Sequence, residues 1–253
     1  ITLEMAEERI AERVDANLFD VTIDDLHAMP KDMYDNKVSK LQKKTIGQLI
    51  IKEYPTASAH SGHFKALIDE LALKKSFKPD IVFIDYLNIC SSSRFRGGNI
   101  SSYFYVKAIA EELRGLAVQY DVPIVSATQT TRSGYLSSDV GLEDTSESFG
   151  LPATADFMFA LISNEELEEL GQIKVKQLKN RYNDPAVNRA FIIGVDRSKM
   201  RLYDVEQSAQ NLSDSNQESK EKLEKPAGPQ PTEAYEKFSD FKIWEKENHQ
   251  YTT

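Results

Sequence analysis

The sequence predicts an α/β fold with a mostly parallel sheet and antiparallel edge strands. Residues 79–93, PDIVFIDYLNICSSS, contain a continuous apolar run, as expected of a parallel strand that is covered on both faces. Segments with the periodicity of a helix alternate with such apolar runs. Residues 172–205 read instead as successive strands with a DRSK turn, which indicates an antiparallel hairpin at the sheet edge.

The first third of the chain predicts a strand, a helix, a polar insert, a second strand and a second helix. These segments are residues 1–4, 5–20, 20–46, 47–55 and 61–75. The first helix has apolar residues at every fourth position, namely Ala6, Ile10, Val14 and Leu18. The second helix has its own apolar face, formed by Phe64, Leu67, Ile68 and Leu71. We expect His60 and His63 to flank the start of this helix rather than bind zinc, because no third ligand is apparent.

The rest of the domain continues the alternation of strands and helices. The predicted strands are residues 81–89, 122–129, 155–162, 172–178, 189–195 and 200–205. A helix at 102–120 is expected to bury Val106, Ile109, Leu113 and Leu116. A polar loop spans 130–150, between the strand that begins near Pro123 and the next strand.

Composition limits the class of protein. The 253 residues, 40% hydrophobic and 28% charged, suffice for one α/β domain with appended sequence. No apolar run reaches the length of a membrane span, no secretory signal is visible, and the single cysteine, Cys90, fits a reducing cytosol. Because the net charge is −9, any contact with nucleic acid must be local, through a few loops.

The composition changes after the predicted α/β domain, which spans residues 1–205. Residues 206–232 are polar and end in a Pro/Gly cluster, so we expect a disordered linker. Residues 233–253 regain aromatic side chains, which predicts a short amphipathic tail that binds a partner.

Asp85 lies near the carboxyl end of the apolar strand, where open α/β sheets bind their ligands. An apolar strand that ends in a carboxylate is the Walker B pattern, in which the aspartate orients a Mg²⁺ ion bound to nucleotide phosphates. An aspartate at this place can equally cap the following turn. The residue alone leaves both interpretations open.

Five segments occur in order: ITLEMAEERIAERV, IVFIDYLNI, PIVSATQTTRS, EDTSESFGLPATADFMFAL and VKQLKNRYNDP. They resemble, in turn, the S-L-E-M strand end, I-x-I-D-Y-L-Q-L, S-Q-L-N-R-S, D-L-R-E-S-G with x-D-A-D, and K-Q-R-N-G-P of the DnaB-family replicative helicases. The resemblance covers residues 1–205 and implies a RecA-like ATPase core. The insert at 20–46 and the acidic tail are most similar to the T-even-type bacteriophage members. A hexamer that encircles single-stranded DNA and uses ATP and Mg²⁺ is therefore implied.

The resemblance also implies roles for three strand-end residues. Glu4 takes the position of the general base, which accepts a proton from the attacking water. Asp85 holds Mg²⁺ through water, and Gln129 hydrogen-bonds the γ-phosphate. The alternatives are a helix-start glutamate favoured by the helix dipole and a structural strand-end glutamine.

Lys179 and Arg181 alternate along a strand end, so both side chains are expected to point the same way. In the family this pair enters the nucleotide site of the neighbouring subunit, with Arg181 as the arginine finger. An isolated K-x-R would be interpreted as an exposed cationic strand end.

Loops that face the channel of the ring are expected to contact single-stranded DNA. The segment SSRFRGGN offers two arginines, an aromatic ring and flexible glycines for that purpose. The expected DNA contacts are Arg94, Arg96, Gly97, Arg132, Ser146, Glu147 and Ser148. Ser146 replaces an arginine of the family motif and Phe149 a glycine, so a charge contact is lost there.

One motif is absent from the sequence. None of the 11 glycines is followed by Lys or Arg, so the phosphate loop G-x-x-x-x-G-K-[ST] is missing. In the family this loop precedes the S-L-E-M strand, and the chain begins with Ile1. We therefore expect the C-terminal part of a helicase, incomplete at the N-terminus and inactive as an ATPase by itself.

Two alternatives remain open. One is another RecA-type ATPase such as a recombinase, against which the K-x-R strand end and the Q-x-x-R-S loop argue. The other is a non-catalytic piece of a split or decayed helicase that binds a replisome partner. Expected partners of the tail are a primase, a helicase loader or a polymerase, in the cytoplasm of an infected host cell.

Overall fold

The computed structural model of the chain describes residues 1–45, 47–95, 100–130, 140–144, 150–184, 187 and 189–205. The chain divides into two compact units, residues 1–213 and 214–253, and every described residue belongs to the first. The predicted linker 206–232 and tail 233–253 thus lie outside the described residues. Within the described part, no helix is long and apolar enough to span a membrane.

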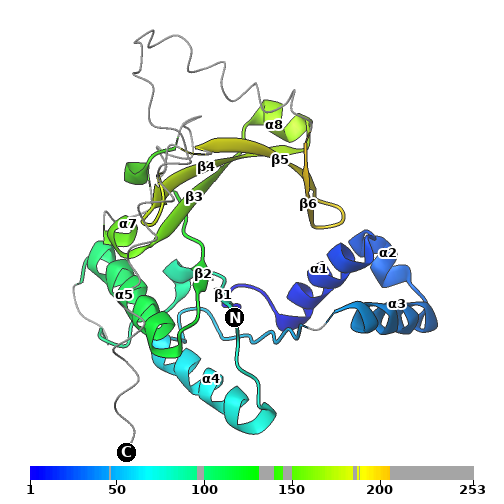
Figure 1. Cartoon of the computed structure of the whole chain (residues 1–253), viewed down its shortest axis with the longest axis horizontal. Helices are drawn as coiled ribbons and strands as arrows, with labels where there is room; N and C mark the ends of the chain where they lie inside the picture. Colours follow the sequence, from blue (N-terminus) through cyan, green and yellow to red (C-terminus); the bar gives the residue numbers. More distant parts are fainter. Residues whose placement is uncertain are drawn as a thin grey trace, which may run out of the picture. The chain divides into compact units, whose positions relative to one another are not determined.

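A small parallel sheet lies beside the N-terminal residues (Figure 1). β1 (Val82–Ile84) pairs in parallel with β2 (Ile124–Ser126). Thr2 extends this arrangement through parallel bridges to Asp85 and to Glu53. The apolar strand pattern therefore predicted the direction of these segments correctly. The predicted strands at 1–4 and 47–55 are reduced to these single bridges in the described structure.

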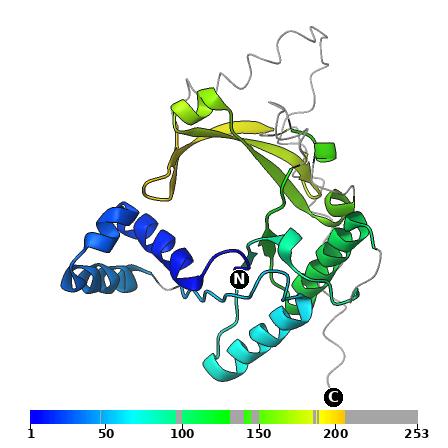
Figure 2. The same ribbon diagram turned by 180° about the vertical axis from the view of Figure 1, so that it is seen from behind.

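Two long helices share one core cluster with the parallel sheet. α4 (Ser61–Lys75) lies beside α5 (Ser102–Tyr120), as Figure 2 shows. The predicted helix at 61–75 is confirmed, with Phe64 and Ile68 buried. The four residues predicted to be buried on the helix at 102–120 are also confirmed as buried. This cluster includes side chains from the N-terminal segment, both helices and β1, among them Leu3, Phe64, Ile84, Ile109 and Leu113.

Only one face of the parallel sheet is covered by the described residues. Val82 and Ile84 are buried, whereas Phe83 is 57% exposed and Val125 is 40% exposed. Neighbouring residues of a strand point to opposite faces, so the alternation in β1 marks a single packed face. The prediction of a strand covered on both faces is wrong for this part of the chain.

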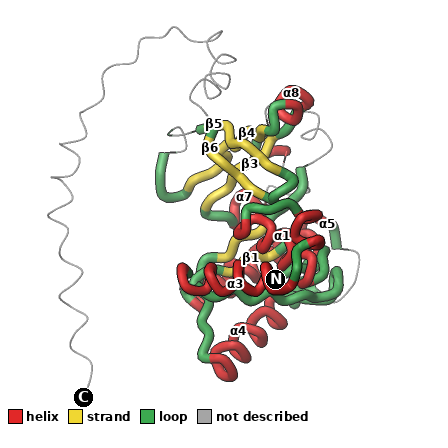
Figure 3. The backbone as a smooth tube through the Cα atoms, turned by 90° about the vertical axis from the view of Figure 1, so that its right-hand side faces the viewer, coloured by secondary structure: helices red, strands yellow, loops and turns green. Residues whose placement is uncertain are grey.

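The second sheet is antiparallel throughout. Its strand order is β3-β4-β5-β6, with β3 Phe157–Ile162, β4 Gln172–Asn180, β5 Ala190–Asp196 and β6 Arg201–Asp204. These strands are drawn in yellow in Figure 3. They lie close in sequence, and short connections favour antiparallel neighbours. The predicted antiparallel component is thus a four-stranded sheet of its own, larger than a set of edge strands.

Short elements connect the two sheets and their strands. η1 (Leu87–Ile89) follows β1, and η2 (Leu142–Asp144) and α7 (Gly150–Thr154) precede β3. α8 (Glu165–Glu169) joins β3 to β4, and its first turn is acidic, which suits the positive end of a helix.

The polar insert at 20–46 folds as two helices that pack with the preceding one. α1 (Glu7–Phe19), α2 (Ile23–Ala28) and α3 (Lys31–Lys44) bury a small cluster of Ala16, Phe19 and Leu26. α1 also donates a hydrogen bond of 2.7 Å from Asn17 Nδ2 to Met200 O, in the β5–β6 turn.

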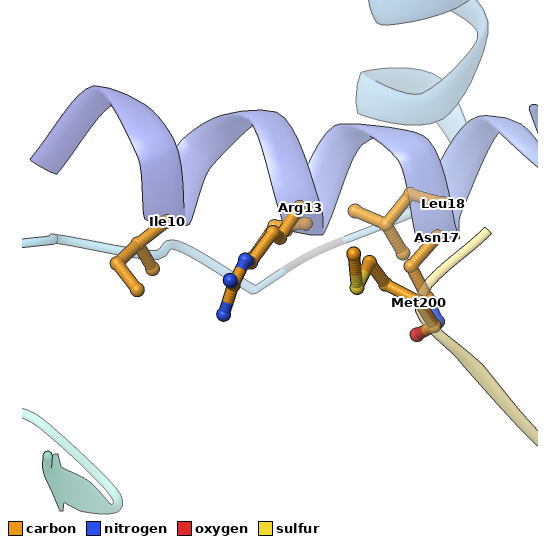
Figure 4. A pocket seen from close by; sticks show the side chains of 6 residues that line it. Ile10, Arg13, Asn17, Leu18 and Met200 are labelled. Carbon is orange, nitrogen blue, oxygen red and sulfur yellow. The ribbon is translucent and has the colours of Figure 1, made fainter. Parts of the chain in front are cut away.

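The predicted apolar stripe of α1 is not its buried face. Leu18 is 50% exposed, while Ala16 and Phe19 are buried against α2 and α3. Ile10, Val14 and Leu18 instead line a surface hollow of about 280 Å³ together with Arg13, Asn17 and Met200 (Figure 4). The four-residue period predicted the helix correctly, and its buried face is formed by other residues.

Candidate active site

Glu4 and Asp85 lie at the ends of adjacent parallel segments. Leu3 N donates to Asp85 O at 2.9 Å, and Asp85 N donates to Ile1 O at 3.0 Å. Both side chains are exposed. Since α1 begins only at Glu7, Glu4 precedes the first helical turn, whose acidic residues are Glu7 and Glu8. The helix-start interpretation of Glu4 therefore has no support from its position.

Gln129 joins the same edge from the end of β2. Leu87 N donates to Ala127 O at 3.2 Å, so the segments that follow β1 and β2 stay together beyond the paired strands. Gln129 Nε2 donates to the hydroxyl oxygen of Tyr86 at 3.0 Å. The structure thus brings Glu4, Asp85 and Gln129 to the carboxyl ends of three neighbouring parallel segments, where α/β sheets bind ligands.

Asp85 fits a site for a hydrated Mg²⁺ ion. Its carboxylate accepts no hydrogen bond from the described residues, so the turn-capping interpretation is not supported. Mg²⁺ keeps several water ligands and takes only one or two carboxylates beside substrate phosphates. In the described part of the chain, no three His, Cys, Asp or Glu side chains form a metal-binding group. A single carboxylate at a ligand-binding edge suits a metal held mainly by water and nucleotide.

Lys179 and Arg181 lie at the end of β4, and both side chains donate to the backbone carbonyl of Ala153. Lys179 Nζ donates to Pro152 O at 2.5 Å and to Ala153 O at 3.4 Å. Arg181 Nη2 donates to Ala153 O at 3.1 Å. The prediction that the two side chains point the same way is confirmed. The pKa of Lys179 is lowered, first by burial and next by the charge of Arg181.

Two further residues, Asp156 and Arg114, belong to the same cluster as Lys179 and Arg181, and the sequence analysis did not identify either of them. Arg181 Nε lies 2.7 Å from Asp156 Oδ1, and Arg114 Nη1 lies 2.6 Å from Asp156 Oδ2. Asp156 belongs to the ATADF segment of the family-like motif, which was a usable signal. Nothing in the helical pattern of residues 102–120 distinguished Arg114.

The two groups of candidate residues are separate within the described part of the chain. No hydrogen bond or ion pair joins Glu4, Asp85 or Gln129 to Lys179 or Arg181 there. Each group is held by its own sheet. The chain therefore carries an acidic group and a cationic group that do not form one site in the described structure.

The DNA-contact candidates are only partly described. Arg94 Nη1 lies 2.5 Å from Glu111 Oε2, so this arginine already has an acidic partner. The adjacent Glu112 accepts hydrogen bonds from Ser92 Oγ at 2.6 Å and from Ser93 N at 2.9 Å, which fixes the start of the loop. The other candidates lie outside the described residues: Arg96, Gly97, Arg132, Ser146, Glu147 and Ser148.

His60 and His63 form the N-terminal cap of α4. Gly62 N donates to His60 Nδ1 at 3.0 Å, and His60 N donates to His63 Nδ1 at 3.2 Å. This reciprocal pattern is a capping box, so the two imidazoles satisfy backbone donors of the first helical turn.

Comparison with known proteins gives consistent matches. Residues 1–214 match the family model described as DnaB-like helicase C terminal domain. The chain is 45% identical over 213 residues to the DnaB-like replicative helicase of Enterobacteria phage T4, covering 83% of this chain and 45% of that protein. It therefore spans less than half the length of this relative.

Solved structures share the fold at low sequence identity. One solved ATPase domain matches with a TM-score of 0.65 at 18% identity, covering 81% of this chain and 73% of that one. A structure of a DnaB-like replicative helicase and its interactions with primase matches with a TM-score of 0.64 at 19% identity, covering 81% and 49%. The predicted RecA-like ATPase fold class is thereby confirmed.

Proposed function

The chain belongs to the family of DnaB-like helicase C-terminal domains, and from this premise we propose that it is part of a hexameric, ATP-dependent replicative DNA helicase. The full-length protein would translocate on single-stranded DNA and unwind duplex at a phage replication fork. The observation that carries this proposal is the meeting of Glu4, Asp85 and Gln129 at the ends of neighbouring parallel segments.

The three residues have complementary tasks in ATP hydrolysis. Glu4 accepts a proton from the water that attacks the γ-phosphate. Asp85 would hold a hydrated Mg²⁺ ion, which would supply positive charge to the nucleotide phosphates. Gln129 hydrogen-bonds the γ-phosphate, and its contact with Tyr86 Oη links the loss of that phosphate to the segment after Asp85.

Lys179 and Arg181 are proposed to act on the nucleotide that is bound to another subunit. The family resemblance implies that they complete the nucleotide site of the neighbouring subunit in a ring, and their place on the other sheet, away from Glu4 and Asp85, is compatible with that role. Arg181 donates to the transferring phosphoryl group, on which negative charge develops. Six such interfaces would couple hydrolysis to the relative position of the subunits.

Single-stranded DNA is the ligand proposed for the loops that begin near Arg94. The pair Arg94–Glu111 is half-exposed and therefore weak, so a DNA phosphate can replace the carboxylate. Arg96, Gly97, Arg132, Ser146, Glu147 and Ser148 are proposed to contact the same strand.

The tail at 233–253 is proposed to bind a replisome protein, such as a primase, a helicase loader or a polymerase, in the cytoplasm of an infected cell. Its aromatic residues would supply the apolar contacts that a tethered segment needs in order to fold onto a partner. Removal of residues 226–253 should leave DNA-stimulated ATPase activity intact and weaken partner-dependent loading. Loss of basal ATPase activity would instead assign the tail a structural role.

A second candidate function is a non-catalytic replisome module. Such a module would bind a replisome partner without hydrolysing ATP. The coding sequence upstream of Ile1 separates the two: an in-frame phosphate loop supports the motor, whereas a stop codon supports the module. Membership of the helicase family argues against a recombinase.

The direct test measures ATP hydrolysis and unwinding of a forked duplex by the full-length protein, with Asp85→Asn as the matched variant. We expect turnover that is stimulated by single-stranded DNA, and loss of both activities in Asp85→Asn. Residues 1–253 alone should hydrolyse no ATP. Turnover by this segment that Asp85→Asn abolishes would show that the phosphates are bound in some other way.

A further inference from the structure

Three cations converge on one carboxylate and on the end of a short helix. Arg114 from α5 and Arg181 after β4 lie 2.6 and 2.7 Å from opposite oxygens of Asp156. Lys179 and Arg181 donate to carbonyl groups of residues 152 and 153, and Arg114 Nη1 donates to Thr154 O at 3.0 Å. The backbone closes the group, because Arg181 N donates to Asp156 O at 2.9 Å.

The charges in this group do not balance. One carboxylate faces three cations, and the carbonyl groups at the end of α7 offset only part of the difference. An excess of positive charge at a partly exposed place attracts anions such as a triphosphate. The contacts with Asp156 and the carbonyl groups therefore order the three cationic side chains, and the remaining positive charge can still attract a phosphate.

The contacts of Arg181 engage one edge of its guanidinium. Nε lies 2.7 Å from Asp156 Oδ1 as an ion pair without hydrogen-bond geometry, and Nη2 donates to Ala153 O and, at 3.5 Å, to Ala155 O. Neither N–H of Nη1 hydrogen-bonds to a residue in the described part of the chain. Since a guanidinium is planar, fixing the Nε edge also fixes the direction in which Nη1 points.

We propose that Asp156 is the positioning residue of the arginine finger: its carboxylate orients Arg181 through Nε, and Arg114 holds that carboxylate from its other oxygen. The inference rests on the proposed function, because it assumes that Arg181 acts on a neighbouring nucleotide. In this role Asp156 acts through Arg181 and not on the substrate itself.

Burial and energetics favour orientation over stability as the role of Asp156. The side chains of Asp156, Arg114 and Arg181 are 36%, 40% and 42% exposed. Ion pairs with this exposure contribute little to folding stability, because water screens the charges. Misplacement of a catalytic group, in contrast, can cost about 100-fold in rate.

The first experiment compares Asp156→Asn with wild type in the full-length protein. We expect ATP turnover to fall by about 10- to 100-fold while KM and nucleotide affinity stay within about twofold. Asp156→Glu, which keeps the charge, should recover part of the loss. Glu70→Gln is the matched control: it removes one carboxylate from an exposed 2.7 Å pair with Lys74 and should leave turnover unchanged. Normal turnover in Asp156→Asn overturns the proposal.

The second experiment identifies the side of the interface on which Asp156 acts. A mixed ring contains an intact site wherever one subunit supplies a working base and its neighbour a working finger. Asp156→Asn subunits should therefore gain activity when mixed with Glu4→Gln subunits, and gain none when mixed with Arg181→Ala subunits. Rescue by Arg181→Ala, or rescue by neither, assigns Asp156 to the base side or to general structure and overturns the proposal.

The two experiments also separate this inference from its premise. If Arg181→Ala alone keeps normal turnover, the trans-acting finger of the proposed function is wrong, and the role of Asp156 fails with it. If Arg181→Ala is inactive and complemented by Glu4→Gln while Asp156→Asn behaves like wild type, the finger stands and only the positioning role is wrong.

Discussion

The candidate residues at the ends of the parallel and antiparallel sheets differ in their hydrogen bonding. At the ends of the parallel segments, Glu4 and Asp85 are exposed, and their carboxylates accept no hydrogen bonds from the described residues. At the end of β4, Lys179 and Arg181 are bonded to carbonyl groups, and Arg181 also lies against Asp156. The acidic group is open to water and metal, whereas the cationic group is fixed before any ligand arrives.

This difference suits the two tasks. A general base and a metal ligand must exchange protons and water, so they need access to solvent. A finger must reach a phosphate of another subunit with little loss of freedom, and a side chain that is already ordered loses less entropy on binding. The comparison supports our proposal that each sheet supplies one half of an active site.

The two sheets also differ in their cores. The parallel sheet shares a large buried cluster with α4 and α5. The antiparallel sheet buries only Val140, Ala160 and Ile162 as a cluster among the described residues, and leaves Phe157, Phe159 and Leu161 exposed. Substitutions in the core of the parallel region should therefore cost more stability than comparable substitutions in the antiparallel sheet.

The largest effect is expected from Arg181→Ala in the full-length protein. Turnover should fall by about three to five orders of magnitude, because the finger stabilises charge on the transferring phosphoryl group. Nucleotide affinity should change little, as measured by equilibrium binding of a fluorescent ATP analogue. A loss of turnover below tenfold would contradict the role of finger and leave an exposed cationic strand end.

Glu4→Gln should have the next largest effect. ATP binding should persist while hydrolysis falls by about two to four orders of magnitude, which is the usual contribution of a general base. Single-turnover kinetics separate the chemical step from binding. Glu8→Gln, in the first turn of α1, is the matched control and should behave like wild type. Near-normal hydrolysis by Glu4→Gln would refute the assignment of the base.

Glu112→Ala tests the stability of the parallel region. Its carboxylate accepts hydrogen bonds from Ser61, Ser92 and Ser93, which would lose their acceptor. We expect a loss of about 2 kcal/mol in the free energy of unfolding, measured with urea. Glu111→Ala, which removes an exposed partner of Arg94, should cost less than about 1 kcal/mol. Equal costs for the two variants would contradict this account.

The same carboxylate predicts a pH dependence. Burial raises the pKa of Glu112, but hydrogen bonds from Ser92, Ser93 and Ser61 outweigh it, so the pKa lies below the ordinary value of 4.5. An acid with a lowered pKa stabilises the fold fully above its unfolded value and loses that contribution as the pH falls through its folded value. Wild type should therefore lose more stability than Glu112→Gln as the pH falls from above 4.5 through the lowered pKa.

His60→Ala should have the smallest effect. It removes the side-chain acceptor at the N-cap of α4 and should lower the free energy of unfolding by about 1 kcal/mol. His60→Asn keeps an acceptor at this position and should recover most of the loss. Turnover should be unchanged in both variants. If His60→Ala and His60→Asn are equally destabilised, packing rather than capping explains the residue.

The sequence predicted most elements because their signals are local. The apolar strands, the buried face of α5 and the turn before β6 follow from periodicity over a few residues. The buried face of α1 could not be predicted from its own period, because its burial depends on α2 and α3, whose polar sequence gave no sign of packing. The exposure of Phe83 has the same origin, since a strand pattern does not specify what covers each face.

The residues of the candidate site likewise differ in whether a local sequence pattern can reveal them. Glu4, Asp85, Gln129, Lys179 and Arg181 occupy strand ends that a motif can mark. Arg114 carries no such mark, because it reaches Asp156 from a helix that is distant in sequence. Contacts of this kind depend on the packing of α5 and α7. Three-dimensional structure was therefore required to find the contacts of Asp156 with Arg114 and Arg181.

The most direct test of the two half-sites mixes two inactive full-length variants. Glu4→Gln subunits retain the finger, and Arg181→Ala subunits retain the base, so some interfaces of a mixed ring contain one intact site. The mixture should recover part of the ATPase activity, while each variant alone, or mixed with the double variant, stays inactive. If subunit exchange is demonstrated and the mixture remains as inactive as its parents, Glu4 and Arg181 do not meet across a subunit interface.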